Sequence, residues 1–259
     1  MEVISPVRTG RFRHRLARGL SLLTAAREHG AGKVQRLLGR ASTLLTQNPV
    51  GGNCGIADGL PLNADQMILG YTQGLFPMDE GGKLRWRYPY PRFGLPLDEL
   101  RVPPELARRL DAGELRVSFD EAPADVLDAC RKNADVPWLS ERLERLYLEL
   151  FQLGMMHTVE TWRGNELFGG SFGLSVGRVW TSEARFERGA HVGDAQFLHL
   201  ARHLARRGYT CIECQVYSEA LVRFGARDMP SDEYRKHLAR GLIAPAIFTE
   251  PSTTPVAGL

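Results

Sequence analysis

The stretch TCIECQV, residues 210–216, places an acid and an amide among the apolar residues of a predicted strand. Because side chains alternate along a strand, Glu213 and Gln215 share one face with Cys211. Both groups need hydrogen-bond partners, since unpaired polar groups are costly on a buried face. A carboxylate can accept a proton, and a glutamine can orient a group through its donor and its acceptor. From the residues alone, catalysis and simple pairing with neighbouring strands remain equally open.

The four cysteines are Cys54, Cys130, Cys211 and Cys214, and the last two form a CxxC sequence. No second cysteine pair and no close histidine completes a zinc site. On a strand, the two thiols of the CxxC would point to opposite faces. We therefore expect buried thiols, no metal and no cofactor, in a protein of the reducing cytoplasm.

The chain has 259 residues, of which 43% are hydrophobic and 24% charged. This composition is typical of a globular protein with one large or two smaller domains. The chain has no run of about 18 apolar residues, so no transmembrane helix is predicted. Its N-terminus has no apolar core followed by a small-residue cleavage site, so no signal peptide is predicted.

Residues 1–46 hold nine Lys or Arg residues and two acids, with leucines among the arginines. Such a basic segment is suited to contact with RNA or with an anionic membrane surface. A solvated extension without a partner is an equally good interpretation.

Hydrophobic spacing and turn residues predict which elements position these side chains. Helices are predicted within residues 64–78, 103–113, 122–133, 140–154, 192–208 and 218–229. Strands are predicted at 115–119, at three or four places within 157–186, and at 209–217. The proline- and aromatic-rich stretch 87–106 predicts an ordered irregular segment or an edge strand. This order of elements is typical of an α+β domain with a mixed sheet.

Several segments stand in an order and at a spacing that resemble one protein family. They are YTQGLFPM, PWLSERLERLYLELFQLGMMHTVETWRGNELFGGSFGLSVGRVW, SEARF, IECQV and RFGARDMPSDEY. Together they resemble the leucyl/phenylalanyl-tRNA–protein transferases over about three quarters of the chain. The resemblance implies a small N-terminal α/β domain followed by a domain built like the GNAT acetyltransferases. It predicts a basic extension at 1–46, the small domain at 47–100, the GNAT-like domain at 101–248 and a tail at 249–259.

The resemblance implies transfer of leucine, phenylalanine or methionine from tRNA to the N-terminal amine of a protein. It implies that Glu213 and Gln215 are catalytic, because aminolysis of an ester requires loss of a proton from the amine and stabilisation of an oxyanion. Glu183 would bind the acceptor terminus. Trp138 and Tyr71 would contact the terminal adenosine of the tRNA. We expect the enzyme to be a monomer.

The residues that correspond to the family's apolar aminoacyl pocket are Ser171, Trp180, Arg185, Leu200 and Leu204. Ser171 and Arg185 are polar where the family has methionine. Unpaired polar groups are costly in an apolar pocket. Either Arg185 turns to solvent, or the pocket holds a polar or acidic group.

Three alternatives follow. The first is a divergent tRNA-dependent transferase with another aminoacyl group, or with a small-molecule amine as acceptor. The second is a CoA-dependent N-acyltransferase, which needs a glycine loop whose amides bind pyrophosphate at a helix start. The stretch FERGAHVGD, residues 186–194, lacks that spacing and has an acid at the helix start. The third, a non-catalytic RNA- or membrane-binding protein, is disfavoured by Glu183, Glu213 and Gln215.

Overall fold

The computed structural model describes residues 62–87, 89, 91–104, 115–134, 137–189 and 192–249. The predicted basic extension 1–46, most of the predicted helix 103–113 and all but the first residue of the predicted tail 249–259 lie outside the described residues. No helix in the described ranges is both long enough and apolar enough to cross a membrane.

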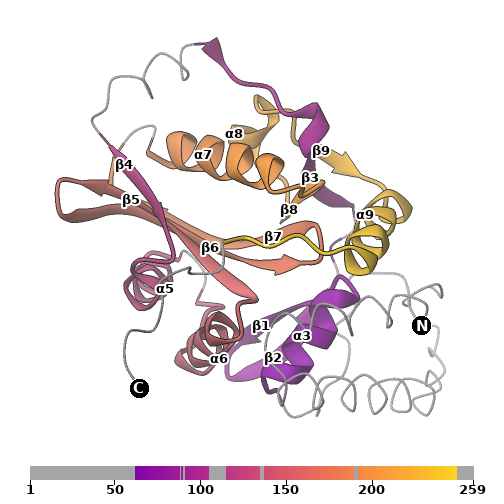
Figure 1. The fold of residues 1–259 in the computed structure, drawn as a ribbon. Coiled ribbons are helices and arrows are strands. Elements are labelled where there is room, and N and C mark those ends of the chain that lie inside the picture. Colours follow the sequence, from indigo (N-terminus) through magenta and orange to yellow (C-terminus); the bar gives the residue numbers. More distant parts are fainter. Residues whose placement is uncertain are drawn as a thin grey trace, which may run out of the picture.

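A mixed sheet of seven strands forms the centre of the described part of the chain, in the order β4–β5–β6–β7–β8–β3–β9 (Figure 1). Neighbouring strands are antiparallel except β7 and β8, which run parallel. The strands are β3 (Arg92–Pro96), β4 (Arg116–Phe119), β5 (Met156–Arg163), β6 (Glu166–Val176), β7 (Val179–Glu187), β8 (Cys211–Gln215) and β9 (Arg227–Met229). The predicted α+β class with a mixed sheet is confirmed.

Helices cover both faces of this sheet. They are α3 (Ala64–Thr72), α5 (Pro123–Lys132), α6 (Glu141–Gln152), α7 (Val192–Arg206), α8 (Glu219–Val222) and α9 (Ser231–Ile243), with a 3-10 helix at Leu97–Glu99. A parallel pair needs a crossover connection, and α7 supplies it between β7 and β8. A separate two-stranded hairpin consists of β1 (Phe76–Glu80) and β2 (Lys83–Arg87).

The predicted elements that fall on described residues form, with four differences. The predicted helix within 64–78 ends at Thr72, and its last three residues belong to β1 instead. The predicted helix within 218–229 ends at Val222, and its last three residues form β9 instead. The expected edge strand within 87–106 is an internal strand, because β3 pairs with β8 on one side and with β9 on the other. The hairpin β1–β2 and helix α9 are not predicted from the patterning.

Helix α6 shows how the sequence specifies one of these elements. The hydroxyl of Ser140 accepts a hydrogen bond from the backbone N–H of Leu143 at 3.4 Å. Such an N-cap typically contributes about 1 kcal/mol. Leu143, Leu146 and Leu150 recur at helical spacing and are buried. Tyr147 lies on the same face, so the helix also carries a hydroxyl group into the core.

The two faces of the sheet pack separate hydrophobic cores. Helices α5 and α6 lie on one face and α7 on the other (Figure 1). Along β8, Cys211 belongs to the first core, whereas Ile212 and Cys214 pack in the second. This confirms the predicted alternation, which puts Glu213 on the face of Cys211. Burial of a side chain such as Ile212 contributes about 1.5–3 kcal/mol, so β8 is held firmly from both sides.

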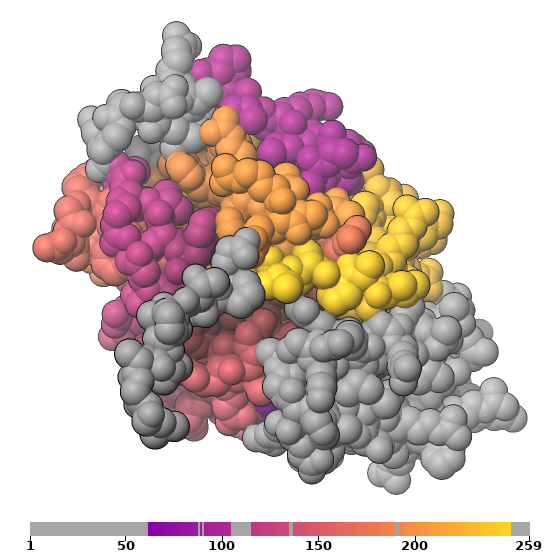
Figure 2. All heavy atoms as spheres, viewed as in Figure 1, coloured from indigo at the N-terminus to yellow at the C-terminus, as the bar shows by residue number. Residues whose placement is uncertain are grey.

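The chain that follows α9 returns along the sheet beside α7. Figure 2 shows the yellow C-terminal atoms directly against the orange atoms of α7. The Nε2 of His203 donates to the carbonyl oxygen of Phe248 at 2.8 Å, and the Nε of Arg207 donates to that of Ile247 at 3.0 Å. The ring of Phe248 stacks on Trp180 with 5.1 Å between ring centres. The second core is therefore closed by the end of the described chain.

The predicted division into domains stays a prediction. Strand β3 belongs to the segment predicted as the small N-terminal domain, yet it lies within the seven-stranded sheet. Helix α3 also shares the first core with α6. The segment predicted as a small domain is thus connected to the rest of the protein by β3, which belongs to the central sheet, and by α3, which packs in the first core.

Candidate active site

The sheet has a defined interruption between β7 and β8. These strands pair at Val179↔Cys211, Trp180↔Ile212 and Thr181↔Glu213, and their pairing stops there. Beyond this point β7 continues along β6, and β8 continues along β3. Side chains that follow Thr181 and Glu213 are therefore positioned by two strands that no longer hydrogen-bond to each other.

Both strands carry a bulge at this interruption. On β7, Ala184 pairs with Phe172 and Ser182 pairs with Gly173, which leaves Glu183 as the extra residue. A bulge redirects the side chain of the extra residue and is common beside active sites. The local sequence and register thus turn Glu183 out of the regular alternation of β7.

The bulge on β8 ends in a tight turn. Cys214 is the extra residue, between Glu213 opposite Gly94 and Gln215 opposite Phe93. Gln215 has a positive φ of 64°, and the N–H of Val216 donates to the carbonyl oxygen of Cys214 at 2.7 Å. This is a γ-turn with a left-handed central residue, a rare and strained conformation that occurs preferentially at functional sites.

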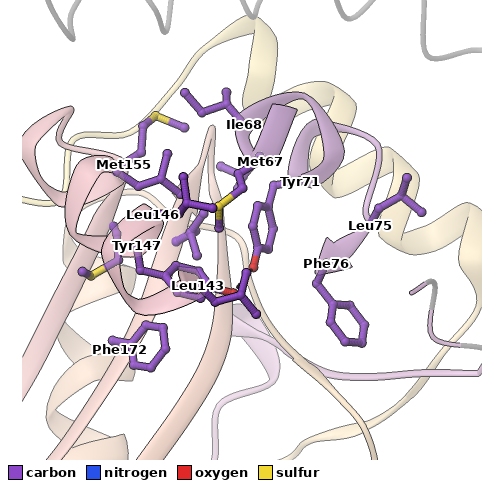
Figure 3. Close-up of a cluster of buried hydrophobic side chains, with 14 of the residues drawn as sticks. Met67, Ile68, Tyr71, Leu75, Phe76, Leu143, Leu146, Tyr147, Met155 and Phe172 are labelled. Atoms are coloured by element: carbon purple, nitrogen blue, oxygen red, sulfur yellow. Dashed lines mark hydrogen bonds between the residues drawn. The ribbon is translucent and has the colours of Figure 1, made fainter. Parts of the chain in front are cut away.

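A chain of hydrogen bonds crosses the interruption. The Nε2 of Gln215 donates to Oε1 of Glu183 at 3.0 Å, and the hydroxyl of Tyr147 donates to Oε2 of Glu183 at 3.0 Å. The hydroxyl of Tyr71 lies 2.8 Å from that of Tyr147 and donates to it, because Tyr147 uses its own proton toward Glu183. Figure 3 shows the two tyrosines, from α3 and α6, pointing toward each other. Four elements thus meet at one carboxyl group.

The environment changes the protonation of these groups. Burial raises the pKa of Glu183 to about 8, and the charge of Glu213 adds to the rise, while the hydroxyls of Tyr71 and Tyr147 and the amide of Gln215 oppose it. Burial also raises the pKa of Tyr71 and of Tyr147, so both hydroxyls stay protonated and remain donors. Glu183 therefore exists in both its protonated and its ionised form near neutral pH.

Glu213 lies beside this chain but is paired with an arginine. Its Oε1 accepts from Nη1 of Arg92 at 2.8 Å, and the two side chains are 2% and 1% exposed. Arg92 also donates to the carbonyl oxygen of Gly74, and its guanidinium lies 3.9 Å from the centre of the Tyr234 ring. Burial raises the pKa of Glu213, and the charge of Arg92 offsets part of that rise. The ion pair anchors β8 at Glu213, two residues before the strained residue Gln215.

Comparison with known proteins identifies the family. Residues 94–239 match the family described as Leucyl/phenylalanyl-tRNA protein transferase. A relative of that name from Salinibacter ruber (strain DSM 13855 / M31) is 36% identical over 183 residues, or 70% of this chain and 80% of the relative. Another from Chlorobium limicola (strain DSM 245 / NBRC 103803 / 6330) is 35% identical over 186 residues, or 70% of this chain and 96% of the relative. The chain belongs to the leucyl/phenylalanyl-tRNA–protein transferase family. It is therefore an enzyme of the transferase class.

The similarity to solved structures is weaker. A GCN5-related glucosamine N-acetyltransferase region of a fungal multi-domain β-N-acetylglucosaminidase aligns with a TM-score of 0.44 and 14% identity, over 68% of this chain and 23% of that chain. Similarity at this level is too weak to assign a superfamily or a function. The GNAT-like character of the transferase domain stays a prediction.

In this transferase, the two residues predicted to be catalytic are near each other but have different partners. Gln215 contacts Glu183, the residue predicted to bind the acceptor, and Glu213 contacts Arg92. Each of these roles stays a prediction. The structure adds Tyr147 and Arg92, which the sequence pattern does not single out. Tyr147 is part of an apolar helical stripe, and Arg92 is a single arginine at the start of the buried strand β3, so neither has a local signal of function.

The residues predicted to contact adenosine lie at the edge of the same cluster. The ring of Trp138 is partly buried and meets the ring of Tyr147 at 87°, with 6.5 Å between ring centres. Tyr71 is only 2% exposed. A base therefore finds no exposed face on Tyr71 in this structure, and the predicted contacts of both residues with tRNA stay predictions.

The residues predicted to line the aminoacyl pocket fall into two groups. Trp180, Leu200 and Leu204 lie together in the second core and are almost completely buried. Ser171 and Arg185 are cross-strand partners on β6 and β7, and Arg185 is exposed. Two outcomes are predicted for Arg185: it turns to solvent, or the pocket holds a polar or acidic group. Its exposure agrees with the first. The pocket itself stays a prediction.

The cysteines within the described ranges agree with the prediction of buried thiols, and Cys54 lies outside those ranges. Cys130 and Cys211 are buried and Cys214 is partly buried, and burial raises the pKa of all three thiols. The thiols of Cys211 and Cys214 pack in different cores, on opposite faces of the sheet. Within the described ranges, no group of three or more His, Cys, Asp or Glu residues is placed to hold a metal.

Proposed function

We propose that this enzyme transfers an amino acid from an aminoacyl-tRNA to the N-terminal amine of a polypeptide, with Glu183 as the group that moves the proton. Membership of the leucyl/phenylalanyl-tRNA–protein transferase family supports the reaction. The location of the active site is supported by the chain of hydrogen bonds from Gln215 through Glu183 to Tyr147, at the point where β7 and β8 stop pairing.

The reaction is aminolysis of an ester. The amine nitrogen attacks the carbonyl carbon of the aminoacyl group, a C–N bond forms, and the C–O bond to the tRNA ribose breaks. The amine must lose a proton, and the leaving ribose oxygen must gain one. A group whose pKa matches that of its partner exchanges protons most efficiently. The pKa of Glu183, about 8, is close to that of an α-amino group, about 7.7–8.0.

Glu183 can therefore take the proton from the amine and return it to the ribose oxygen. Gln215 uses its Nε2 to hold Glu183, and among the described residues no donor is paired with its Oε1. That oxygen is available to orient an N–H of the amine. The ester is already activated, so holding the amine near the carbonyl supplies much of the rate. The role of Glu213 is then to fix the strand that carries Gln215, through its ion pair with Arg92.

The donor follows from the family name, which specifies leucine and phenylalanine. Arg185 does not oppose this choice, because it is an exposed residue. A long cationic side chain can lie along an apolar wall while its head stays solvated. The acceptor is the N-terminus of a protein, and a small-molecule amine is the alternative acceptor.

The start of α7 disfavours the CoA-dependent alternative. The N–H of Gly193, in the first turn, donates to a carboxylate oxygen of Glu187 at 2.7 Å. Asp194 adds a second acid to the same turn. Backbone amides at a helix start bind pyrophosphate only when they are free of such acids.

The test is transfer from total tRNA charged with a mixture of labelled amino acids. We expect labelled leucine or phenylalanine to move to a polypeptide N-terminus, and nuclease treatment of the tRNA to abolish transfer. Gln215→Ala should reduce transfer at least about tenfold, equivalent to about 1.4 kcal/mol of barrier. Gln152→Ala, an exposed glutamine on α6, serves as the matched control. Near-normal turnover of a folded Gln215→Ala variant would remove Gln215 from the mechanism.

A further inference from the structure

The two residues that follow the strained turn at Gln215, Val216 and Tyr217, both have large and exposed side chains. Val216 is 68% exposed and Tyr217 is 66% exposed. Single exposed apolar residues are common on protein surfaces. These two are consecutive, and they begin at the residue that follows the amide of the proposed site. The γ-turn that aims Gln215 at Glu183 therefore also presents an apolar surface to solvent.

Tyr217 is anchored although most of it is exposed. The edge of its ring meets Phe93, with 5.2 Å between ring centres and 63° between planes. Phe93 is buried and stands opposite Gln215 in the pairing of β3 with β8. The position of the Tyr217 ring is thus coupled to the two strands that carry the site. Aromatic rings held in this way offer a large contact area at a low cost in conformational entropy.

The segment that follows the turn carries more acids than bases. Residues 216–233 contain the acids Glu219, Asp228, Asp232 and Glu233 and the two arginines Arg223 and Arg227. Both arginines are in ion pairs, Arg223 with Asp194, and Arg227 with Glu99 and Glu233. A polyanion such as tRNA needs unpaired cations where it binds. A positively charged polypeptide N-terminus is the better match for excess acid.

We propose that Val216 and Tyr217 bind the acceptor polypeptide just beyond its N-terminal residue. The inference rests on the proposed function, which places the acceptor amine beside Glu183 and Gln215. An extended chain advances about 3.3–3.6 Å per residue. An acceptor that runs in the direction of the chain after Gln215 would place its second and third residues beside Val216 and Tyr217. Contact with main chain and aliphatic groups at this surface would add affinity without strict sequence preference.

The experiment compares two acceptors that share one N-terminal residue, an amino acid amide and a tetrapeptide amide. We expect the wild-type enzyme to use the tetrapeptide with the higher kcat/KM. Tyr217→Ala and Val216→Ser should remove at least about fivefold of that advantage through KM. Transfer to the amino acid amide should be unchanged. Ile243→Ala, a side chain that is 69% exposed on α9, is the matched control and should leave both acceptors unaffected.

Three outcomes would overturn the proposal. Equal losses with both acceptors would show that the residues act on the reaction centre and not on the peptide. Weaker binding of aminoacyl-tRNA, with the peptide advantage kept, would make Tyr217 a stacking platform for a base. An unchanged peptide advantage in the folded Val216→Ser and Tyr217→Ala variants would leave the surface without this partner. Absence of transfer to either acceptor by the wild-type enzyme would contradict the proposed function itself.

Discussion

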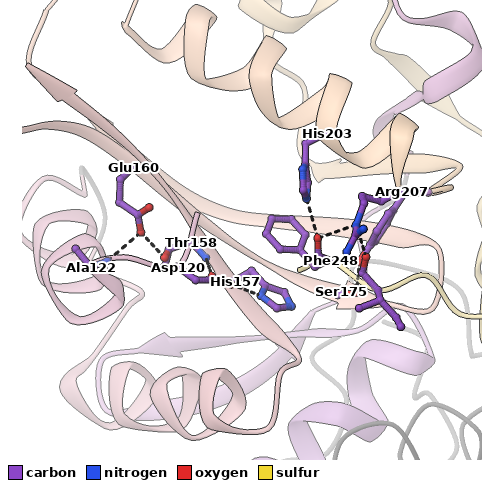
Figure 4. A network of polar contacts seen from close by, with 11 residues as sticks. Asp120, Ala122, His157, Thr158, Glu160, Ser175, His203, Arg207 and Phe248 are labelled. Atoms are coloured by element: carbon purple, nitrogen blue, oxygen red, sulfur yellow. Dashed lines mark hydrogen bonds and ion pairs between the residues drawn. The ribbon is translucent and has the colours of Figure 1, made fainter. Parts of the chain in front are cut away.

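Two regions of this transferase bury carboxylates in chains of hydrogen bonds, and they are built differently. In the β4–β5 region, the carboxylate of Glu160 accepts from the hydroxyl of Thr158 at 2.5 Å and from the N–H of Ala122 at 3.3 Å (Figure 4). It also accepts from the hydroxyl of Ser118 at 2.8 Å. Glu160 is completely buried and stands opposite Ser118 in an unbroken antiparallel ladder. Neutral donors surround the acid on all sides.

The second region is the end of the β7–β8 pair with Glu183 and Gln215, called here the strand-end region. Its acid, Glu183, lies where the pairing of β7 with β8 stops. Glu183 is the extra residue of a bulge, and its chain of partners includes the strained residue Gln215. Its pKa is raised to about 8. Glu160 is completely buried and Glu183 is partly buried, so burial alone does not mark function. The difference lies in their positions in the sheet: one acid completes a continuous ladder, and the other stands at the end of a strand pair beside a strained turn.

The largest expected effect concerns the ion pair that supports the strand-end region. Arg92→Ala leaves the carboxylate of Glu213 buried without its cation and should lower the free energy of unfolding by about 3–5 kcal/mol. Urea unfolding measures it. In the β4–β5 region, the pair Arg116–Glu121 is 53% and 49% exposed, so Arg116→Ala should cost less than about 1 kcal/mol. Similar losses for both variants would mean that the Arg92–Glu213 pair does not anchor β8.

The second prediction compares the two acids directly. Glu183→Gln removes the proposed proton acceptor and should lower kcat/KM by about a hundredfold or more, while the protein stays folded. Glu160→Gln should lower the free energy of unfolding by about 1–3 kcal/mol and leave the turnover of the folded enzyme unchanged. Turnover and unfolding are measured on both variants. A reversal, with Glu160→Gln inactive and Glu183→Gln active, would refute the distinction between the two regions.

The third prediction uses the pH dependence of stability. Folding raises the pKa of Glu183 from an ordinary 4.5 to about 8, so between these values the folded protein binds more protons than the unfolded chain. The stability contributed by Glu183 is therefore complete below about pH 4.5 and is lost as the pH rises through about 8. Glu183→Gln mimics the protonated acid. Wild type should lose stability relative to this variant from pH 5 to pH 8.5, measured by urea unfolding. Parallel curves would mean that Glu183 titrates normally.

The faces of Cys211, Ile212 and Cys214 on β8 could be predicted, because alternation is a local property of a strand. Cys211 and Ile212 do pack in different cores. The partners of Gln215 could not be predicted in the same way. Its contact with Glu183 depends on two bulges, and a bulge shifts the register by one residue without a fixed sequence signal.

The contribution of Tyr147 shows a second limit. Its helical spacing correctly predicts that it faces the core, but its hydroxyl meets that of Tyr71, which is 76 residues away in the sequence. Local patterning contains no information about such a contact. The hairpin β1–β2 is a different case, because Gly81 and Gly82 both have positive φ and form a two-residue turn that the sequence displays. Pro77 and the charged residues around it lack the alternation that would complete the signal.

The smallest effect is expected at Arg185, on the rim of the strand-end region. Arg185 is exposed and stands opposite Ser171, and the apolar residues predicted for the aminoacyl pocket are buried elsewhere in the second core. An exposed arginine can keep its guanidinium in water when a leucyl or phenylalanyl group binds. Arg185→Met should therefore change the ratio of leucyl to phenylalanyl transfer by less than about threefold, which is about 0.65 kcal/mol. Ser171→Met tests the opposing position on β6. Competition between the two charged tRNAs, with a polar aminoacyl-tRNA as a third donor, measures the ranking. If Arg185→Met instead moves the preference tenfold toward leucine or phenylalanine, the arginine selects the donor side chain and the wild-type enzyme favours a polar one.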